Sequence, residues 1–261
     1  MNNRRGVTLT ALLLLTICSV CTLIISPSFV PGILLPLGGI GLVLLLATFQ
    51  NLGMVIPVFV RARTQRKQIA LTFDDGPHPD FTPQALEILA RFHAPACFFC
   101  LGWRVEEFPE IVKEIVSRGH EVGNHSYRHP VFLAFSSPAR VRQEVLRTQQ
   151  AFLACLGAPP PYYRQPLGIL NPFLFKALSE EHLQLVGYSL YARDNNLDTP
   201  EAICRHVMAR VQPGQVIVLH DGLANRPHHR RLSIDALPLI LDALRKEGYE
   251  VVPLKTLMQD G

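Results

Sequence analysis

Two groups of side chains in this sequence have the types and spacing needed for hydrolytic chemistry. In LTFDDGPHP (71–79), Asp74 and Asp75 stand side by side after an apolar run and before a Gly-Pro turn. In GNHSYRHP (123–130), His125 and His129 are four residues apart, so on a helical turn they would share one face. Two such imidazoles and one carboxylate are a ligand set for a divalent metal ion with one position left open. The simpler alternatives are a turn or helix cap for the aspartates and a solvated loop for the histidines.

The two adjacent aspartates would have different roles in such a site. Asp75 would bind the metal ion, and Asp74 would take a proton from the attacking water. The ion would offset the repulsion between the two carboxylates. It would also lower the pKa of water enough to make hydroxide available near neutral pH.

The elements that must position these residues alternate between strand-like and helix-like segments. The expected strands are 68–73, 96–102, 120–124, 183–190, 215–220 and 249–254, and the expected helices are 82–92, 107–118, 138–156, 200–210 and 232–247. This alternation predicts a parallel sheet with helices outside, and the number of units favours a barrel-like closure. Active sites in such folds lie at the carboxyl ends of strands. Asp74–Asp75 and His220–Asp221 both follow strands.

Five motifs occur in the order TFDDGP, HSYRH, RQPLG (164–168), the Asp194 region and VLHD (218–221). Together they resemble the motifs of NodB-type polysaccharide deacetylases, metal-dependent carbohydrate esterases that remove acetyl groups from sugars. The resemblance covers residues 68–257. It implies an α/β fold, a distorted (β/α) barrel of the NodB deacetylase type.

The resemblance also implies roles for the metal-binding half of the site. Asp74 resembles the catalytic base. Asp75, His125 and His129 look like the ligands of one divalent ion, usually zinc and sometimes cobalt or another metal. Arg164 resembles the arginine that orients the base through an ion pair.

The other half of the site would stabilise the transition state and protonate the leaving group. His220 resembles the general acid, and Asp194 the carboxylate that holds it. The backbone N–H of Leu167 would stabilise the oxyanion, and Leu219 would shape the pocket for the acetyl methyl group. Asp198 is the alternative to Asp194.

Two motifs depart from the family pattern. The third commonly reads Arg-Pro-Pro-aromatic-Gly, whereas residues 164–168 read RQPLG. The fourth usually has Trp after its Asp, whereas Asn195 follows Asp194 here. Both changes concern contacts with the sugar more than the reaction, and they suggest a substrate other than a long chitin-like chain.

We expect the first 60 residues to form a separate, membrane-anchoring region. Gly6 to Val60 contain no charged residue, and two apolar runs, 7–25 and 33–49, are each near the length of a transmembrane helix. We expect two membrane helices; one helix plus a buried segment, or a cleaved signal peptide, are the alternatives. Arg4–Arg5 and the basic linker 61–67 flank the runs, so the charges place both ends in the cytoplasm of a bacterial inner-membrane protein. A single span would place the domain outside.

The charge and composition of the chain indicate which classes of binding partner to expect. The net charge of +4 without a dense Lys/Arg stripe gives no sign of nucleic-acid binding. The expected partners are the membrane and an N-acetylated glycan, either a polymer such as peptidoglycan or a lipid-linked sugar; a formyl group on such a sugar is also compatible. Two alternatives to a deacetylase stay open: an inert sugar-binding module, and a redox protein that uses Cys97 and Cys100 (CFFC). The two Phe residues between these cysteines favour a buried strand instead.

Overall fold

The computed structural model describes residues 57–169, 171, 173–222 and 227–259. Both predicted membrane runs lie outside these ranges. Within the described ranges, no helix combines the length and the apolar character needed to cross a bilayer.

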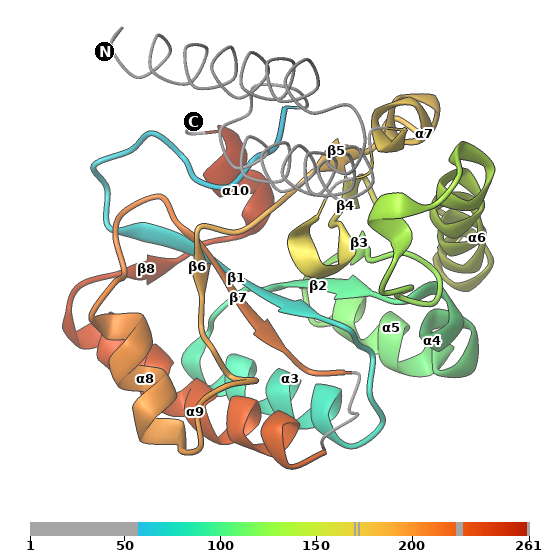
Figure 1. Ribbon diagram of the computed structural model, residues 1–261. Helices are drawn as coiled ribbons and strands as arrows, with labels where there is room; N and C mark the ends of the chain where they lie inside the picture. The colour runs from blue at the N-terminus through green and yellow to red at the C-terminus, as the bar shows by residue number, and fades with distance from the viewer. Residues whose placement is uncertain (1–56, 170, 172, 223–226, 260–261) are drawn as a thin grey trace, which may run out of the picture. The chain divides into compact units, whose positions relative to one another are not determined.

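Strands and helices alternate along the described chain (Figure 1). The strands are β1 (Gln68–Asp74), β2 (Cys97–Cys100), β3 (Glu121–Asn124), β4 (Tyr162–Tyr163), β5 (Gln184–Leu185), β6 (Leu190–Tyr191), β7 (Val216–His220) and β8 (Glu250–Val251). The helices are α3 (Phe81–Phe92), α4 (Gly102–Glu107), α5 (Pro109–Ser117), α6 (Pro138–Leu156), α7 (Leu174–Glu180), α8 (Pro200–Met208), α9 (Pro227–Lys246) and α10 (Leu254–Gln259). Two short 3-10 helices, η1 (Leu133–Phe135) and η2 (Pro166–Gly168), lie in loops.

The strands form one curled, parallel sheet. Its order is β5-β4-β3-β2-β1-β7-β6, and β8 pairs with the first residues of β1. β5 and β6 follow one another in the chain but lie at opposite edges, so residues 186–189 cross from one edge to the other. The predicted barrel is therefore a half-barrel whose two edges are joined by this crossover rather than by strand pairing. For the same reason, the single strand expected at 183–190 is two short strands.

β1 lies at the centre of the sheet because it is apolar on both faces. Ile69, Leu71 and Phe73 pack in a buried cluster with side chains of α3, α5, α8 and α9, the helices that cover one face of the sheet (Figure 1). Ala70 packs in a second cluster on the other face. Burial on both faces is typical of parallel strands with long apolar runs.

The CFFC motif is strand β2, and its two cysteines are buried and not disulfide-bonded. Successive side chains of a strand alternate between faces, so Cys97 and Cys100 belong to different core clusters. Burial raises the pKa of both thiols well above the ordinary value. This pair is therefore not arranged for redox chemistry, and the redox interpretation of the motif is wrong.

Helix α6 has the bounds that its capping residues predict. Ser137 accepts a hydrogen bond from the Arg140 backbone N–H, Pro138 occupies the first turn, and Gly157 ends the helix with φ 78°. Helix α3, in contrast, begins at Phe81 and not with Thr82 as its N-cap. The Thr82 hydroxyl is used elsewhere, as an acceptor for the His78 N–H and a donor to Asp221.

The start of the predicted basic linker is part of the folded domain. Ala62 is buried, and its backbone N–H donates to Gly214 O at 2.8 Å. The Arg61 side chain donates to Pro213 O and to Gln212. The domain therefore extends upstream of the boundary predicted at residue 68.

Candidate active site

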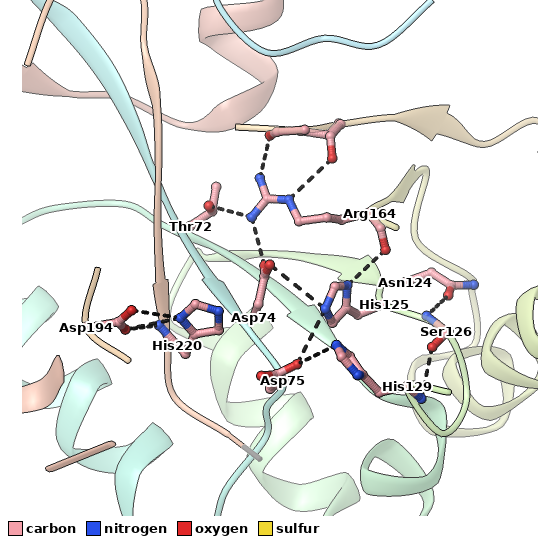
Figure 2. A network of polar contacts seen from close by, with 12 residues as sticks. Thr72, Asp74, Asp75, Asn124, His125, Ser126, His129, Arg164, Asp194 and His220 are labelled. Carbon is pink, nitrogen blue, oxygen red and sulfur yellow. Dashed lines mark hydrogen bonds and ion pairs between the residues drawn. The ribbon is translucent and has the colours of Figure 1, made fainter. Parts of the chain in front are cut away.

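Side chains from four strands converge at the carboxyl edge of the sheet (Figure 2). Asp74 is the last residue of β1 and pairs in register with His220, the last residue of β7. His125 directly follows β3, and Arg164 directly follows β4. The sequence places polar residues after these strands, and the parallel topology brings them to one edge.

Three donor atoms meet at one point of this edge. Asp75 Oδ1 lies 3.4 Å from His125 Nε2 and 3.5 Å from His129 Nε2. One ligand atom from each residue lies within 4.8 Å of the others. Two ligands bound tetrahedrally to one zinc ion at about 2.0–2.1 Å would be about 3.3 Å apart. The donor set and its spacing therefore fit a divalent ion such as zinc.

The hydrogen bonds of His125 orient its ring for metal binding. Its Nδ1 lies 2.8 Å from the backbone carbonyl oxygen of Arg164. A carbonyl oxygen only accepts, so Nδ1 carries a proton, and in the neutral ring the lone pair is then on Nε2, toward Asp75. Such an outer hydrogen bond fixes the tautomer and the direction of a ligating histidine.

The histidine motif is an irregular turn and not the helical turn that the spacing suggested. Ser126 and His129 have left-handed backbone conformations, with φ 66° and 55°. Asn124 Oδ1 accepts from the Ser126 N–H, and Ser126 Oγ accepts from the His129 N–H. These bonds, and not helix geometry, bring the two imidazole rings to a centroid distance of 5.3 Å.

Sequence reasoning missed a residue that holds this turn. The carboxylate of Glu144 is buried and accepts from the backbone N–H groups of Tyr127 and Arg128, both at 2.9 Å. Glu144 belongs to the buried face of α6 beside Val141 and Val145. A single charged residue on a helix face that is otherwise uncharged was the signal that could have identified it.

The base candidate Asp74 is held by a buried arginine. Arg164 Nη1 donates to Asp74 Oδ1 at 2.7 Å and to Thr72 Oγ1 at 2.7 Å. Its other nitrogens donate to carbonyl oxygens of the crossover, Val186 O at 3.3 Å and Gly187 O at 2.8 Å. The guanidinium therefore fixes one oxygen of Asp74, while the other lies 3.9 Å from His125 Nε2.

The ionisable groups shift one another's pKa values. Burial alone would raise the pKa of Asp75, but the hydrogen bond with His125 and the charge of His220 outweigh it and lower this pKa below its usual range. Burial would lower the pKa of His125, but Asp74 and Asp75 raise it. The pKa of His129 is lowered by burial and by the charge of His125. Asp75 is thus kept as a carboxylate, the form that binds a cation.

His220 and Asp194 form a second hydrogen-bonded pair at the same edge. His220 Nδ1 lies 2.9 Å from Asp194 Oδ1, and the His220 backbone N–H donates to Asp194 Oδ2 at 2.8 Å. Asp194 is fully buried and also accepts from the Ser233 hydroxyl. The bond between Nδ1 and Asp194 fixes the orientation of the His220 ring at this edge. The alternative carboxylate, Asp198, is exposed.

The two predicted substrate-contacting residues, Leu167 and Leu219, lie in different environments: one side chain is exposed and the other is buried. Leu167 lies in η2 with φ 58°, and its side chain is exposed. Leu219 is fully buried in the cluster between the sheet and the helices. Since strand side chains alternate, Leu219 points away from the face of His220. The prediction that it shapes a substrate pocket does not fit this position; Val218, two residues before His220, shares the correct face.

The sequence and the fold of this chain are similar to those of several known proteins. Residues 61–186 match the family model described as polysaccharide deacetylase. A peptidoglycan-N-acetylglucosamine deacetylase of Bacillus cereus is 35% identical over 195 residues, covering 74% of this chain and 89% of that protein. A chitooligosaccharide deacetylase of Bradyrhizobium is 34% identical over 215 residues, covering 77% and 98%. A crystal structure of a peptidoglycan N-acetylglucosamine deacetylase superposes with a TM-score of 0.73 at 31% identity, covering 78% of this chain and 94% of that one.

Proposed function

Because the chain belongs to the polysaccharide deacetylase family, we propose that this hydrolase removes the acetyl group from N-acetylated sugars in a glycan of the peptidoglycan or chitooligosaccharide type. One observation carries the proposal. The carboxylate of Asp75 lies 3.4 and 3.5 Å from two imidazole nitrogens, next to an Asp74 that Arg164 holds. A metal-ligand set and a positioned base are the two parts that hydrolysis of an amide needs.

Asp75, His125 and His129 would hold the metal ion, and we propose zinc. Two nitrogen donors and one carboxylate are a usual set for catalytic zinc, which keeps one position open. When bound, such an ion supplies Lewis-acid chemistry that polarises the amide carbonyl and acidifies water.

The protein side chains would carry the proton transfers. Asp74 takes the proton of the water that attacks the acetyl carbon, and the bond from Arg164 keeps its carboxylate turned toward that water. His220 then donates a proton to the sugar nitrogen as the C–N bond breaks, because an amine leaves readily only when protonated. Asp194 keeps the His220 ring oriented for that transfer. The Leu167 N–H is proposed to stabilise the oxyanion.

The substrate class is the finer part of the proposal. The exposed Leu167 stands where the family pattern has an aromatic residue, so a contact with the sugar is altered. Peptidoglycan, a chitooligosaccharide and a lipid-linked N-acetylated sugar are the substrates to compare. An inert sugar-binding module is the alternative, but the convergence of base, metal ligands and acid favours catalysis.

An acetate-release assay tests the proposal. The full chain would be incubated with peptidoglycan fragments, chitotetraose and a polyprenyl-linked N-acetylated sugar, before and after treatment with a chelator and after zinc is restored. We expect acetate from at least one substrate, loss with the chelator and recovery with zinc. No acetate from any substrate by the zinc-loaded protein would contradict the proposal.

Metal analysis provides a second readout. His125→Ala should lower the bound zinc well below one ion per chain. His206→Ala, on helix α8, is the matched control and should keep it. Equal metal content in the two variants would contradict the assignment of the ligands.

A further inference from the structure

Two loops beside the active site, the second of which continues into the first turn of α7, carry most of the large apolar side chains that the described part of the chain exposes. Ten such side chains are exposed there, and six of them lie within residues 131–135 and 167–175. Their exposed fractions range from 51% to 73%. We name this group the apolar rim; it consists of Val131, Phe132, Phe135, Leu167, Phe173 and Phe175.

The apolar rim is fixed to the active site. The first loop begins directly after His129, and the second begins directly after Arg164. The buried Asn171 joins them, because its Nδ2 donates to Leu133 O at 3.0 Å and to Ser136 O at 2.8 Å. The two loops therefore present one surface, next to the metal ligands.

The exposed charges around the apolar rim are mainly basic, although Glu180 at the end of α7 is exposed and pairs with Arg142 at 2.9 Å. Between residues 128 and 179 the sequence has a single carboxylate, Glu144, and it is buried. The exposed charged side chains of that stretch are all basic: Arg128, Arg140, Arg142, Arg147 and Lys176. Aromatic side chains flanked by basic residues are the pattern of a surface that contacts an anionic bilayer.

The exposed phenylalanines indicate a contact surface. Exposed apolar side chains that gather on one part of a protein, rather than singly, are typical of interaction sites. The chain that precedes residue 57 contains the two uncharged apolar runs, 7–25 and 33–49, which we expect to hold the protein at a membrane. A bilayer is therefore a surface that the domain would meet.

We propose that the apolar rim is a membrane-contact surface that inserts its phenylalanines into an anionic bilayer beside the active site. The inference rests on the proposed function and sharpens it: the active site would work at the level of the lipid headgroups. A sugar carried on a lipid would reach the site there without leaving the membrane.

Quenching by brominated lipid tests the contact. In a Trp103→Phe background, Phe132→Trp or Phe175→Trp would place a single tryptophan in the rim. Leu239→Trp, at an exposed apolar position of α9, is the matched control. The full chain would be reconstituted in vesicles of phosphatidylglycerol and phosphatidylcholine, with and without bromine on the acyl chains.

We expect bromine to quench the rim tryptophans and not the tryptophan at position 239, with weaker quenching when phosphatidylglycerol is omitted. Equal quenching at position 239, or none in the rim, would overturn the proposal. So would a response of the rim tryptophans to chitotetraose in detergent without quenching by lipid, since that would make the rim a platform for a glycan.

Activity separates this inference from the proposed function. The double variant Phe132→Ser/Phe175→Ser should lower kcat/KM about tenfold for the polyprenyl-linked sugar in vesicles, because burial of two aromatic side chains is lost. With soluble chitotetraose it should match Leu239→Ser. Equal changes with both substrates would count against the membrane contact. If the unaltered protein released no acetate from any substrate, the proposed function would fail, while the quenching result would still decide the contact.

Discussion

The two ends of the parallel sheet both bury ionisable side chains, but they use them differently. At the carboxyl end, Asp75 faces His125 and His129, so the ionisable groups face one another. At the amino end, Glu121 accepts hydrogen bonds from the backbone N–H groups of Leu254 and Lys255 at the start of α10, and His120 Nδ1 accepts from a backbone N–H. A buried or half-buried ionisable side chain alone does not mark a functional site, whereas ionisable side chains that converge on one another do.

The pKa shifts have the same contrast. At the amino end burial dominates: it raises the pKa of Glu121, and with the charge of Arg118 it lowers the pKa of His120 to about 4. At the carboxyl end the pKa of Asp75 is lowered in spite of burial, because the histidines around it prevail. At the amino end, burial disfavours the charged forms of the ionisable groups. At the carboxyl end, neighbouring side chains keep Asp75 ionised in spite of its burial.

The largest expected effect is at the carboxyl end. Asp74→Asn should lower kcat on the order of 10³-fold, because the amide keeps the shape of the base and cannot accept the proton of water. Bound metal should stay close to that of the unaltered protein, while Tm should fall because the buried Arg164 loses its charged partner. A variant with near-normal turnover would mean that this end does not use Asp74 as its base.

A smaller loss of activity is expected from the residue behind the acid. Asp194→Asn should lower kcat by about 10–100-fold, because the amide does not fix the charged ring of His220 as the carboxylate does. The pH profile of kcat should change shape as well, which a loss of packing alone would not produce. If kcat fell and its pH profile did not change, Asp194 would have only a structural role, like the ionisable residues at the amino end of the sheet.

At the amino end we expect stability to change and activity to remain. Glu121→Gln should lower the free energy of unfolding by about 1.5 kcal/mol, because the amide has one acceptor oxygen instead of two and leaves one backbone N–H at the start of α10 without its bond. Urea denaturation would measure this, with the exposed Glu247→Gln as control. A loss of kcat in the folded variant would contradict the prediction that the amino end of the sheet contributes to stability and not to catalysis.

The smallest effect is a dependence of stability on pH. The pKa of His120 is about 4 in the folded protein, against an ordinary value of 6.5. Below pH 6.5 the unfolded chain therefore binds a proton that the folded protein excludes, and stability falls until about pH 4. Between pH 7 and pH 5.5 the contribution of this group is about 1 kcal/mol. His120→Gln should remove it, whereas the exposed His182→Gln should not; equal slopes in both variants would contradict the assignment.

The elements that sequence predicted well are those with local signals. Helix α6 is framed by Ser137, Pro138 and Gly157, which specify its ends without tertiary contacts. The short helices α4, α7 and α10 were not predicted as separate elements, since six or seven residues give little periodicity. The crossover at 186–189 was also missed, because the apolar run 183–190 carries no sign that its two halves pair at opposite edges of the sheet.

The site was predicted better than the loops that build it. The structure brings together the predicted metal ligands, the base with Arg164, and His220 with Asp194. The positions of Asn124 and Glu144 were not predicted, because their hydrogen bonds depend on a turn whose left-handed residues have no clear signature in sequence. Leu219 was assigned to the face of His220, although adjacent side chains of one strand point to opposite faces of the sheet.

One guanidinium connects the catalytic machinery to the architecture of the fold. Arg164 bonds Asp74 and Thr72 on β1 and, on its other side, the carbonyl oxygens of the crossover that joins the two sheet edges. A lysine carries the same charge but has one compact ammonium group, so it cannot make this planar, divergent set of bonds. A replacement that loosened the bonds of this side chain to the crossover would therefore also release Asp74, so that the half-barrel would lose stability and the enzyme its positioned base together.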